Sequence, residues 1–256
     1  MLATRYVTPL REGGSLPAII EADDLGMYVL KFRGAGQGVL ALLAELVAGE
    51  IGRAVGLRVP ELVFVQVAPE LGRNEGDPEI QSLLQSSIGL NLGMDYLPGS
   101  VMFNQAAHDL VDEQVASLAV WFDAFVTNVD RTARNPNLLS WHRNLYFIDH
   151  GAALYFHHDW GNLEEKAKSR FPVIKSHLLL PWAGNLRYAD VQAPSRLAAE
   201  TIFAILSQVP DAWLVPEEGA PDAATKREQY LSYFQTRLQH AENFVQEAID
   251  ARSRLL

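Results

Sequence analysis

The spacing of the apolar residues changes at Leu97-Pro98-Gly99, and this change constrains the fold more than any other feature of the chain. Ahead of this turn, short β-branched runs between glycine- or proline-marked turns predict strands at residues 5–17, 18–22, 27–32, 62–67 and 89–96. After it, apolar residues recur with helical spacing at residues 112–126, 195–209 and 225–254, and two short strands are expected near residues 138–139 and 145–148. We therefore expect an α+β protein with two lobes, a strand-rich N-lobe of residues 1–97 and a mostly helical C-lobe of residues 98–256.

Two local signals add detail to the N-lobe. The connector Asp23-Asp24-Leu25-Gly26 between two apolar runs predicts a hairpin. One long helical pattern covers residues 39–55, and Gly56 after it suits a C-terminal cap, because glycine readily adopts a left-handed backbone. Lys31 then lies in the second strand of the hairpin, and Glu45 lies on the helix that follows.

Composition excludes several classes of protein. The formal net charge of −10 gives nucleic acid no general attraction to this chain, so we expect no nucleic-acid partner. The chain has no cysteine, which excludes disulfides and thiolate chemistry. No apolar run reaches the ~20 residues of a membrane helix. The first residues also lack the apolar core of a signal peptide, so we expect a cytoplasmic protein without membrane insertion. The sequence does not indicate an oligomeric state.

Acidic and amide side chains gather between residues 127 and 151. Asp130 follows the helical pattern, Asn135 comes five positions later, and Asp149 ends an apolar run before His150-Gly151. One carboxylate that positions a nucleophile, together with a carboxylate and an amide oxygen that hold Mg²⁺, is the set that phosphoryl transfer needs. Asn137 lies two residues after Asn135, and the sequence does not distinguish the two as the metal ligand.

Lys31 is the candidate cation for nucleotide phosphates. Glu45 can reach it from the following helix, with Glu50 as the competing partner on the same helix. An ion pair of this kind holds the phosphate-binding lysine of protein kinases in place. The turn Gly13-Gly14-Ser15 ahead of the lysine is placed to cover a nucleotide, although neither it nor the glycines at residues 34–38 match the Walker pattern.

The order of these motifs resembles the HipA-like branch of the protein-kinase superfamily. The resemblance covers about residues 5 to 160 and includes the segments 45–60 and 94–99. Thr127-Asn128-Val129-Asp130-Arg131 and Ile148-Asp149-His150-Gly151 also resemble the catalytic and metal loops of phosphatidylinositol 3/4-kinases. The resemblance implies a two-lobed, protein-kinase-like fold that binds ATP and Mg²⁺.

The resemblance also implies roles for individual residues on the nucleotide side. Lys31 would bind the phosphates, and Glu45 would orient it. The turn at 94–99 resembles the hinge between kinase lobes, so the backbone of Asp95, Tyr96 and Leu97 would bind adenine.

On the catalytic side, the resemblance gives Asp130 the role of positioning or deprotonating the acceptor hydroxyl. Asp149 and Asn135 would bind Mg²⁺, and Asn137 competes with Asn135 for this role. His150 departs from the phenylalanine that many kinases carry after the metal-binding aspartate, but the metal role depends on Asp149 alone.

The function that these expectations favour is ATP- and Mg²⁺-dependent phosphotransfer to a hydroxyl acceptor. The HipA-like resemblance suggests a protein serine or threonine, and the inositide-kinase-like loops suggest a small alcohol or lipid head group. The alternative is a pseudokinase, a nucleotide-binding or regulatory module without transferase activity. Because Lys31, Asp130 and Asp149 are all present, the sequence favours the enzyme.

Overall fold

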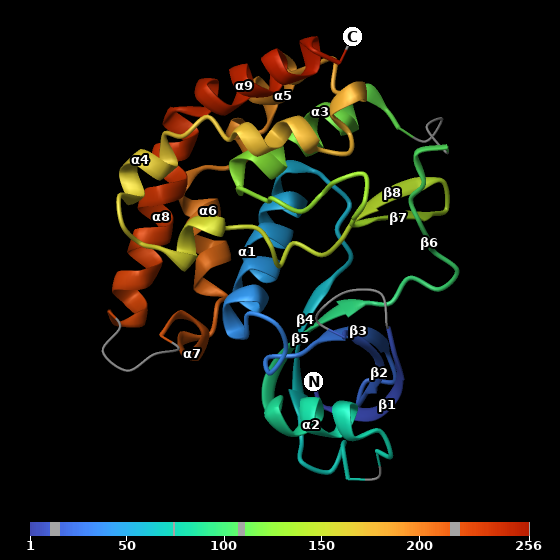
Figure 1. The fold of residues 1–256 in the computed structure, drawn as a ribbon. Coiled ribbons are helices and arrows are strands. Elements are labelled where there is room, and N and C mark those ends of the chain that lie inside the picture. The colour runs from blue at the N-terminus through green and yellow to red at the C-terminus, as the bar shows by residue number, and fades with distance from the viewer. Residues whose placement is uncertain (11–15, 74, 107–110, 216–220, 256) are drawn as a thin grey trace.

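The structure is a computed structural model that describes residues 1–10, 16–73, 75–106, 111–215 and 221–255. A sheet of strands occupies one end of the molecule and helices occupy the other, as Figure 1 shows. Within the described ranges, none of the helices has the length and apolar character needed to cross a membrane.

The N-terminal part is a five-stranded antiparallel sheet. Its strands are β1 (Ala3–Pro9), β2 (Ala18–Ala22), β3 (Met27–Lys31), β4 (Leu62–Val67) and β5 (Gly89–Asp95), in the spatial order β1-β2-β3-β5-β4. The predicted hairpin is present, since Glu21 pairs with Met27 across it. The sheet curls (Figure 1), and a bridge from Leu2 to Gln66 joins β1 to β4. The strand expected over residues 5–17 is shorter and begins earlier.

Helix α1 (Val39–Val55) follows β3 and ends at Gly56, as expected from the sequence. Gly56 has a φ of 104°, a left-handed conformation that glycine adopts without strain, and its N–H caps the carbonyl groups of the last turn. Helix α2 (Pro78–Ser86) begins at Asp77, whose side chain accepts a hydrogen bond from the Glu79 N–H. Helix α2 packs against the small hydrophobic core of the sheet, whereas α1 packs in a second, larger core.

The C-terminal part consists mostly of helices, with one small sheet. The helices are α3 (Glu113–Phe125), α4 (Leu163–Ala167), α5 (Leu186–Gln192), α6 (Ala199–Ser207), α7 (Asp211–Leu214), α8 (Ala223–Gln239) and α9 (Ala241–Ser253). Short 3₁₀ helices are η2 (Tyr155–His158), η3 (Pro172–Ser176), η4 (Leu180–Trp182) and η5 (Pro194–Arg196). The antiparallel sheet has the order β6 (Val101–Met102), β7 (Leu138–Trp141) and β8 (Asn144–Phe147).

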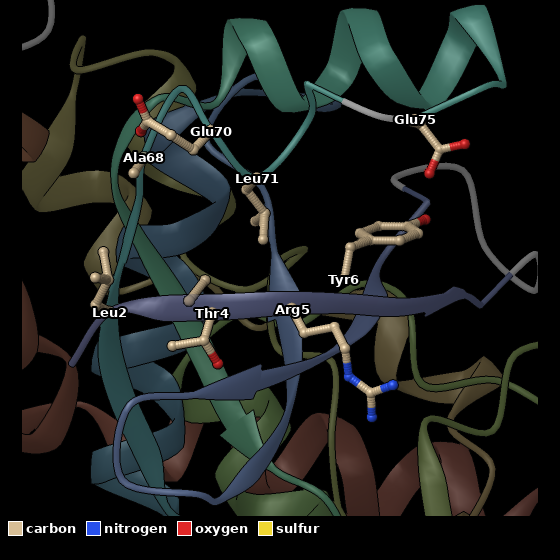
Figure 2. A pocket seen from close by; sticks show the side chains of 9 residues that line it. Leu2, Thr4, Arg5, Tyr6, Ala68, Glu70, Leu71 and Glu75 are labelled. Carbon is tan, nitrogen blue, oxygen red and sulfur yellow. The ribbon is translucent and has the colours of Figure 1, made fainter.

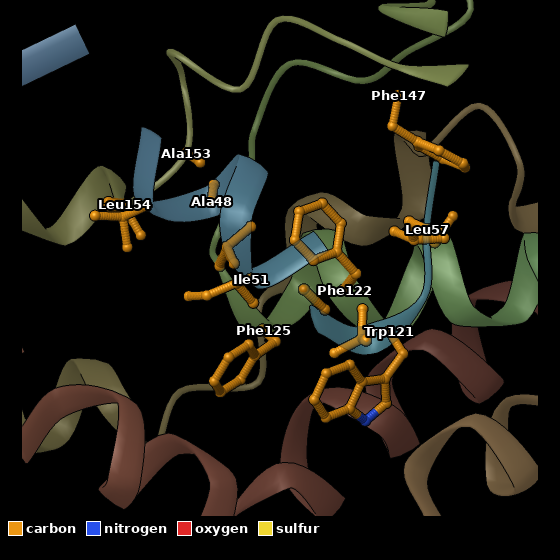
Figure 3. Close-up of a cluster of buried hydrophobic side chains, with 14 of the residues drawn as sticks. Ala48, Ile51, Leu57, Trp121, Phe122, Phe125, Phe147, Ala153 and Leu154 are labelled. Carbon is orange, nitrogen blue, oxygen red and sulfur yellow. The ribbon is translucent and has the colours of Figure 1, made fainter. Parts of the chain in front are cut away.

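The larger core joins α1 to the C-terminal helices. Figure 3 shows Ala48 and Ile51 of α1 facing Phe122 and Phe125 of α3. All four side chains are fully buried. Gly52 allows this close approach, because a Cβ at that position would lie 3.3 Å from the Phe122 ring. The first long helix therefore packs with the helical part, although in sequence it lies between strands β3 and β4 of the sheet.

Two expectations about the helices differ from the structure. The helix expected over residues 195–209 is shorter, because the 3₁₀ helix η5 precedes it and α6 begins at Ala199. The single helical pattern over residues 225–254 is two helices, α8 and α9, separated at His240. His240 has φ −116° and ψ 27°, which lies outside the helical region and turns the chain. Helix α8 then packs on α4 and α6, and α9 packs on α3 and α5. Each of the two helices buries an apolar face against its own partners. The apolar residues therefore keep helical spacing on both sides of His240, and this spacing does not show the break.

Candidate active site

A cleft of about 1230 Å³ lies where the five-stranded sheet meets the C-terminal part of the chain. The sequence-predicted residues that line it are Lys31, Asp95, Tyr96, Leu97, Asp130, Asn135, Asn137 and Asp149. Glu45 lies behind Lys31, fully buried on α1. Gly13, Gly14 and Ser15 lie outside the described residues, so their predicted role stays a prediction.

Lys31 joins the two sides of this cleft. Its Nζ lies 2.6 Å from Glu45 Oε2 and 2.6 Å from Asp149 Oδ1. Burial alone lowers the pKa of Lys31, but the two carboxylates outweigh it and hold the pKa above its usual value. Burial likewise raises the pKa of Glu45, and the charge of Lys31 and the contacts with His150 outweigh this effect and keep the pKa well below its usual range. The ion pair is therefore charged on both sides.

The two candidate glutamates on α1 have different surroundings. Glu45 faces Lys31, whereas Glu50 lies 3.7 Å from Arg53 on its own helix. Partial burial raises the pKa of Glu50. Of the two, Glu45 is the one that contacts the lysine.

The loop after β8 carries Asp149 and turns sharply. Asp149 has a φ of 55°, a left-handed conformation that aspartate tolerates better than most residues. The His150 main-chain N–H donates to Glu45 Oε2 at 2.6 Å, so Glu45 holds both the lysine and this loop. The His150 ring is buried and packs edge-on against Phe122, with centroids 5.7 Å apart.

The loop after α3 carries Asp130 and both asparagines. Asn135 Nδ2 donates to Asp130 Oδ2 at 2.6 Å, and the Thr132 N–H donates to the Asn135 carbonyl at 3.0 Å. Asn137 is almost fully buried, and its Nδ2 lies 3.4 Å from the Asp149 carbonyl. Asn135 therefore contacts the carboxylate of Asp130, and Asn137 contacts the main chain of the loop after β8.

The segment that follows β5 forms one end of the cleft. The Asp95 N–H donates to the Glu61 carbonyl at 2.8 Å, and the Tyr96 N–H donates to the Met27 carbonyl at 3.1 Å. Among the described residues, the Leu97 N–H has no protein acceptor. In the segment whose backbone is expected to bind adenine, the N–H of Leu97 is thus the one left for a ligand among Asp95, Tyr96 and Leu97.

Sequence reasoning missed the buried polar residues beneath the cleft. Asp123 on α3 and Arg131 beside Asp130 form an ion pair in which both side chains are fully buried. A single carboxylate within an apolar helical pattern was the available signal, since such a group requires partners. Arg134, which lines the cleft near Asp130, was also missed.

A second hollow of about 570 Å³ lies between β1 and the segment that follows β4. Figure 2 shows Tyr6 rising from β1 towards Glu75, with Leu71 pointing back towards the strand. Arg5 at its rim forms a salt bridge with Glu21. The sequence-predicted site residues that the structure describes all lie away from this hollow.

Comparison with solved structures identifies a protein of similar fold. A Helicobacter pylori proinflammatory kinase, CtkA, superimposes with a TM-score of 0.59, and the match covers 99% of this chain and 99% of that one. The two chains are 13% identical, so the likeness concerns the fold alone. It confirms the predicted α+β, protein-kinase-like fold.

Comparison of the sequence gives the family. No protein of curated function matches the chain. The model of the HipA-like kinases matches residues 4–246, which is nearly the whole chain. The matched range includes the residues that line the cleft. The chain belongs to the HipA-like kinase family.

Proposed function

We propose that this protein transfers the γ-phosphoryl group of ATP to a hydroxyl acceptor with the help of Mg²⁺. The observation that carries the proposal is the position of Lys31, whose Nζ contacts Glu45 and Asp149 in one cleft. Asp130 and Asn135 line the same cleft. Phosphoryl transfer depends on positioning and charge stabilisation rather than on covalent chemistry, and this set of side chains supplies both.

The nucleotide would occupy the inner part of the cleft. Its base would lie between the apolar side chains that line this region, among them Val29, Leu139 and Ile148. The Leu97 N–H would donate to the base, and Lys31 would donate to phosphate oxygens. Glu45 keeps the lysine in place, so the ammonium loses little freedom when the nucleotide binds.

The side-chain oxygen atoms near the loop after β8, which carries Asp149, suit Mg²⁺. This ion is usually bound by one or two carboxylates together with substrate phosphates. Asp149 and Asn135 would provide the protein ligands, and the described residues hold no larger cluster of acidic or histidine side chains that would form a full protein cage. When bound, Mg²⁺ would neutralise charge on the phosphates. Asn137 is better suited to supporting Asp149 than to binding the ion, because it is buried against the main chain of that loop.

Asp130 would receive the proton of the acceptor hydroxyl. Asn135 holds one of its carboxylate oxygens by a hydrogen bond, and the other oxygen is left for the hydroxyl. The acceptor oxygen forms a bond to the γ-phosphorus while the bond to the bridging oxygen of ADP breaks, and the proton goes to Asp130. The family favours a protein serine or threonine as acceptor. The likeness of the loops to inositide kinases keeps a small alcohol as the second class.

The test is Mg·ATP turnover and autophosphorylation by the wild type and by Asp130→Asn and Asp149→Asn. We expect both variants to lose at least 100-fold in rate, and Asp149→Asn to lose the Mg²⁺-dependent thermal shift with ATP as well. Glu50→Gln is the matched control, because Glu50 lies on α1 outside the Lys31 pair. A thermal shift with ATP but no transfer by the wild type would indicate the pseudokinase instead. Mg·ATP binding that survives Asp149→Asn unchanged would contradict the metal assignment.

A further inference from the structure

Asp123 is a buried carboxylate that the proposed chemistry does not use. It lies on α3, beneath the cleft, with no exposed surface. It accepts three hydrogen bonds, from Asn128 Nδ2 at 2.8 Å, Arg131 Nε at 2.6 Å and His177 Nε2 at 2.8 Å. These donors come from the loop after α3 and from the segment between η3 and η4, so one side chain joins two separate parts of the chain.

Each of the first two donors leads to a residue of the candidate site. Asn128 Oδ1 accepts a hydrogen bond from the Asp130 N–H at 3.1 Å. Arg131 Nη1 donates to the Asn137 carbonyl and lies 3.4 Å from the Ile148 carbonyl, directly before Asp149. The Ile148 N–H also donates to the Asn137 carbonyl at 3.1 Å, so the two loops are joined at this point.

The third donor, His177, has a defined tautomer. The Leu179 N–H donates to His177 Nδ1 at 3.0 Å, so Nδ1 must be unprotonated. Nε2 therefore carries the hydrogen and donates it to Asp123, in a neutral ring. The neighbouring Leu178 N–H donates to the Arg131 carbonyl at 3.0 Å, which adds a second connection between this segment and the loop.

The charges in this cluster balance. Asp123 carries one negative charge, Arg131 carries one positive charge, and His177 is neutral. Burial raises the pKa of Asp123, but Arg131 and His177 outweigh this and hold the pKa below its usual range. A buried ion pair is often no more stabilising than apolar side chains of the same size. A gain in stability is thus a weak reason for a buried carboxylate at position 123. The hydrogen bonds by which it holds the surrounding loops in place are a stronger one.

We propose that Asp123 is a positioning residue, which sets the separation of Asp130 and Asp149 through Asn128 and Arg131 and connects both to the segment at His177. The proposal rests on the proposed function, because it assigns Asp130 and Asp149 their roles. In phosphoryl transfer, a displacement of about 1 Å between reacting groups can cost 100-fold in rate. A rigid connection from beneath the cleft prevents that displacement without touching the substrate.

The kinetic test uses two neutral replacements of His177. His177→Gln keeps an amide donor near the position of Nε2, and His177→Asn keeps only an acceptor near the position of Nδ1. We expect His177→Asn and Asp123→Asn to lower kcat at least 10-fold with KM for Mg·ATP within about threefold of the wild type. His177→Gln should restore kcat to within about threefold, and His158→Asn, at an exposed histidine, is the control. Equal kcat values for the two His177 variants would overturn the proposal.

A second measurement does not depend on turnover. Histidine nitrogen–proton correlation spectra should show His177 in the Nε2–H tautomer, and the Nδ1–H tautomer or a charged ring would overturn the proposal. Backbone amide spectra of His177→Asn should show shifted signals for Asp130 and Asp149, and unchanged signals would also overturn it. Shifted signals in a protein that turns over no ATP would support the connection and contradict the proposed function. If Asp123→Asn does not fold, the His177 variants alone decide.

Discussion

At the scale of single residues, Glu45 connects the lysine of the cleft to the loop after β8. It is fully buried, shares a hydrogen bond with Lys31 and accepts the His150 N–H. A buried charge that loses its partner is strongly destabilising, whereas a paired one is tolerated. The glutamate therefore serves the stability of the protein as well as the orientation of the lysine.

The first prediction concerns Glu45 and acid. Because the pKa of Glu45 is lowered in the folded state, its contribution to folding is fully present above the unfolded pKa of ~4.3 and is lost as the pH falls towards the folded pKa. We expect Glu45→Gln to lower the free energy of unfolding by about 3 kcal/mol at pH 7. Urea denaturation between pH 7 and pH 3 should show the difference from the wild type shrinking below pH ~4.

Glu50→Gln is the control for this series, because Glu50 lies beside Arg53 and does not contact Lys31. It should change the free energy of unfolding by less than ~0.5 kcal/mol. A difference between wild type and Glu45→Gln that stays constant down to pH 3 would contradict the assignment of a lowered pKa.

The second prediction separates the two asparagines. Asn135→Ala should raise the Mg²⁺ concentration needed for ATP turnover at least 10-fold and leave the melting temperature nearly unchanged, because Asn135 is half-buried at the cleft. Asn137→Ala should lower the free energy of unfolding by about 1–3 kcal/mol, since Asn137 is buried with a φ of 47°. Thermal melts and Mg²⁺ titrations measure both effects. The reverse pattern would make Asn137 the metal ligand.

At the scale of elements, the sequence predicted best where two independent signals agree. Helix α1 and strand β4 have the expected bounds, and α3 lies within one residue of them, because periodicity coincides with a cap or a proline at the boundary. Strand β6 was not predicted, since two residues are too short to show a period. The break at His240 was missed because its cause is the packing of α8 and α9 on different helices, which is not a local property.

The candidate site also has parts that the sequence predicted and parts that it did not. The order of short motifs was enough to expect Lys31, Glu45 and Asp149 in one cleft, where the structure brings them into contact. The choice between Glu45 and Glu50 depends on which face of α1 is turned towards Lys31, and the sequence alone does not show this. Of the partners of Asp123, His177 lies 54 positions away in sequence, so no local pattern could have indicated it.

The third prediction belongs to the end of α1. Gly56→Ala should lower the free energy of unfolding by at least ~1 kcal/mol, because alanine is strained at a φ of 104° and its Cβ would collide with the Arg196 side chain. Gly76→Ala is the matched control, since a Cβ there has open space and an ordinary φ. Chemical denaturation of both variants measures the effect. Equal losses would show that the cap contributes nothing specific.

At the scale of the whole molecule, the Lys31–Glu45 pair joins two hydrophobic cores. Lys31 ends strand β3, whose neighbour Leu30 lies in the smaller core of the sheet with Ile20 and Val65. Glu45 lies on α1, whose apolar residues belong to the larger core with α3. The cleft thus has one wall in each core, and the ion pair connects them.

The fourth prediction follows from this division. The amides of α1 should exchange with solvent hydrogen at the rate of those in α3, and more slowly than those of β2 and β3, because local stability follows the core that an element packs in. Hydrogen-exchange mass spectrometry measures this directly. Exchange of α1 together with β2 and β3 would instead assign the helix to the same cooperative unit as the sheet.

The hydrogen bond from the His150 N–H to Glu45 bears on how this sequence can vary over time. The donor is the main chain, which every residue except proline possesses. The main-chain bond therefore does not depend on which side chain stands at position 150, whereas the His150 ring packs against Phe122 and its Nδ1 lies 3.5 Å from Glu45 Oε1. A substitution of His150 would therefore keep the main-chain link between α1 and the loop after β8 and lose the contact of the ring with Glu45.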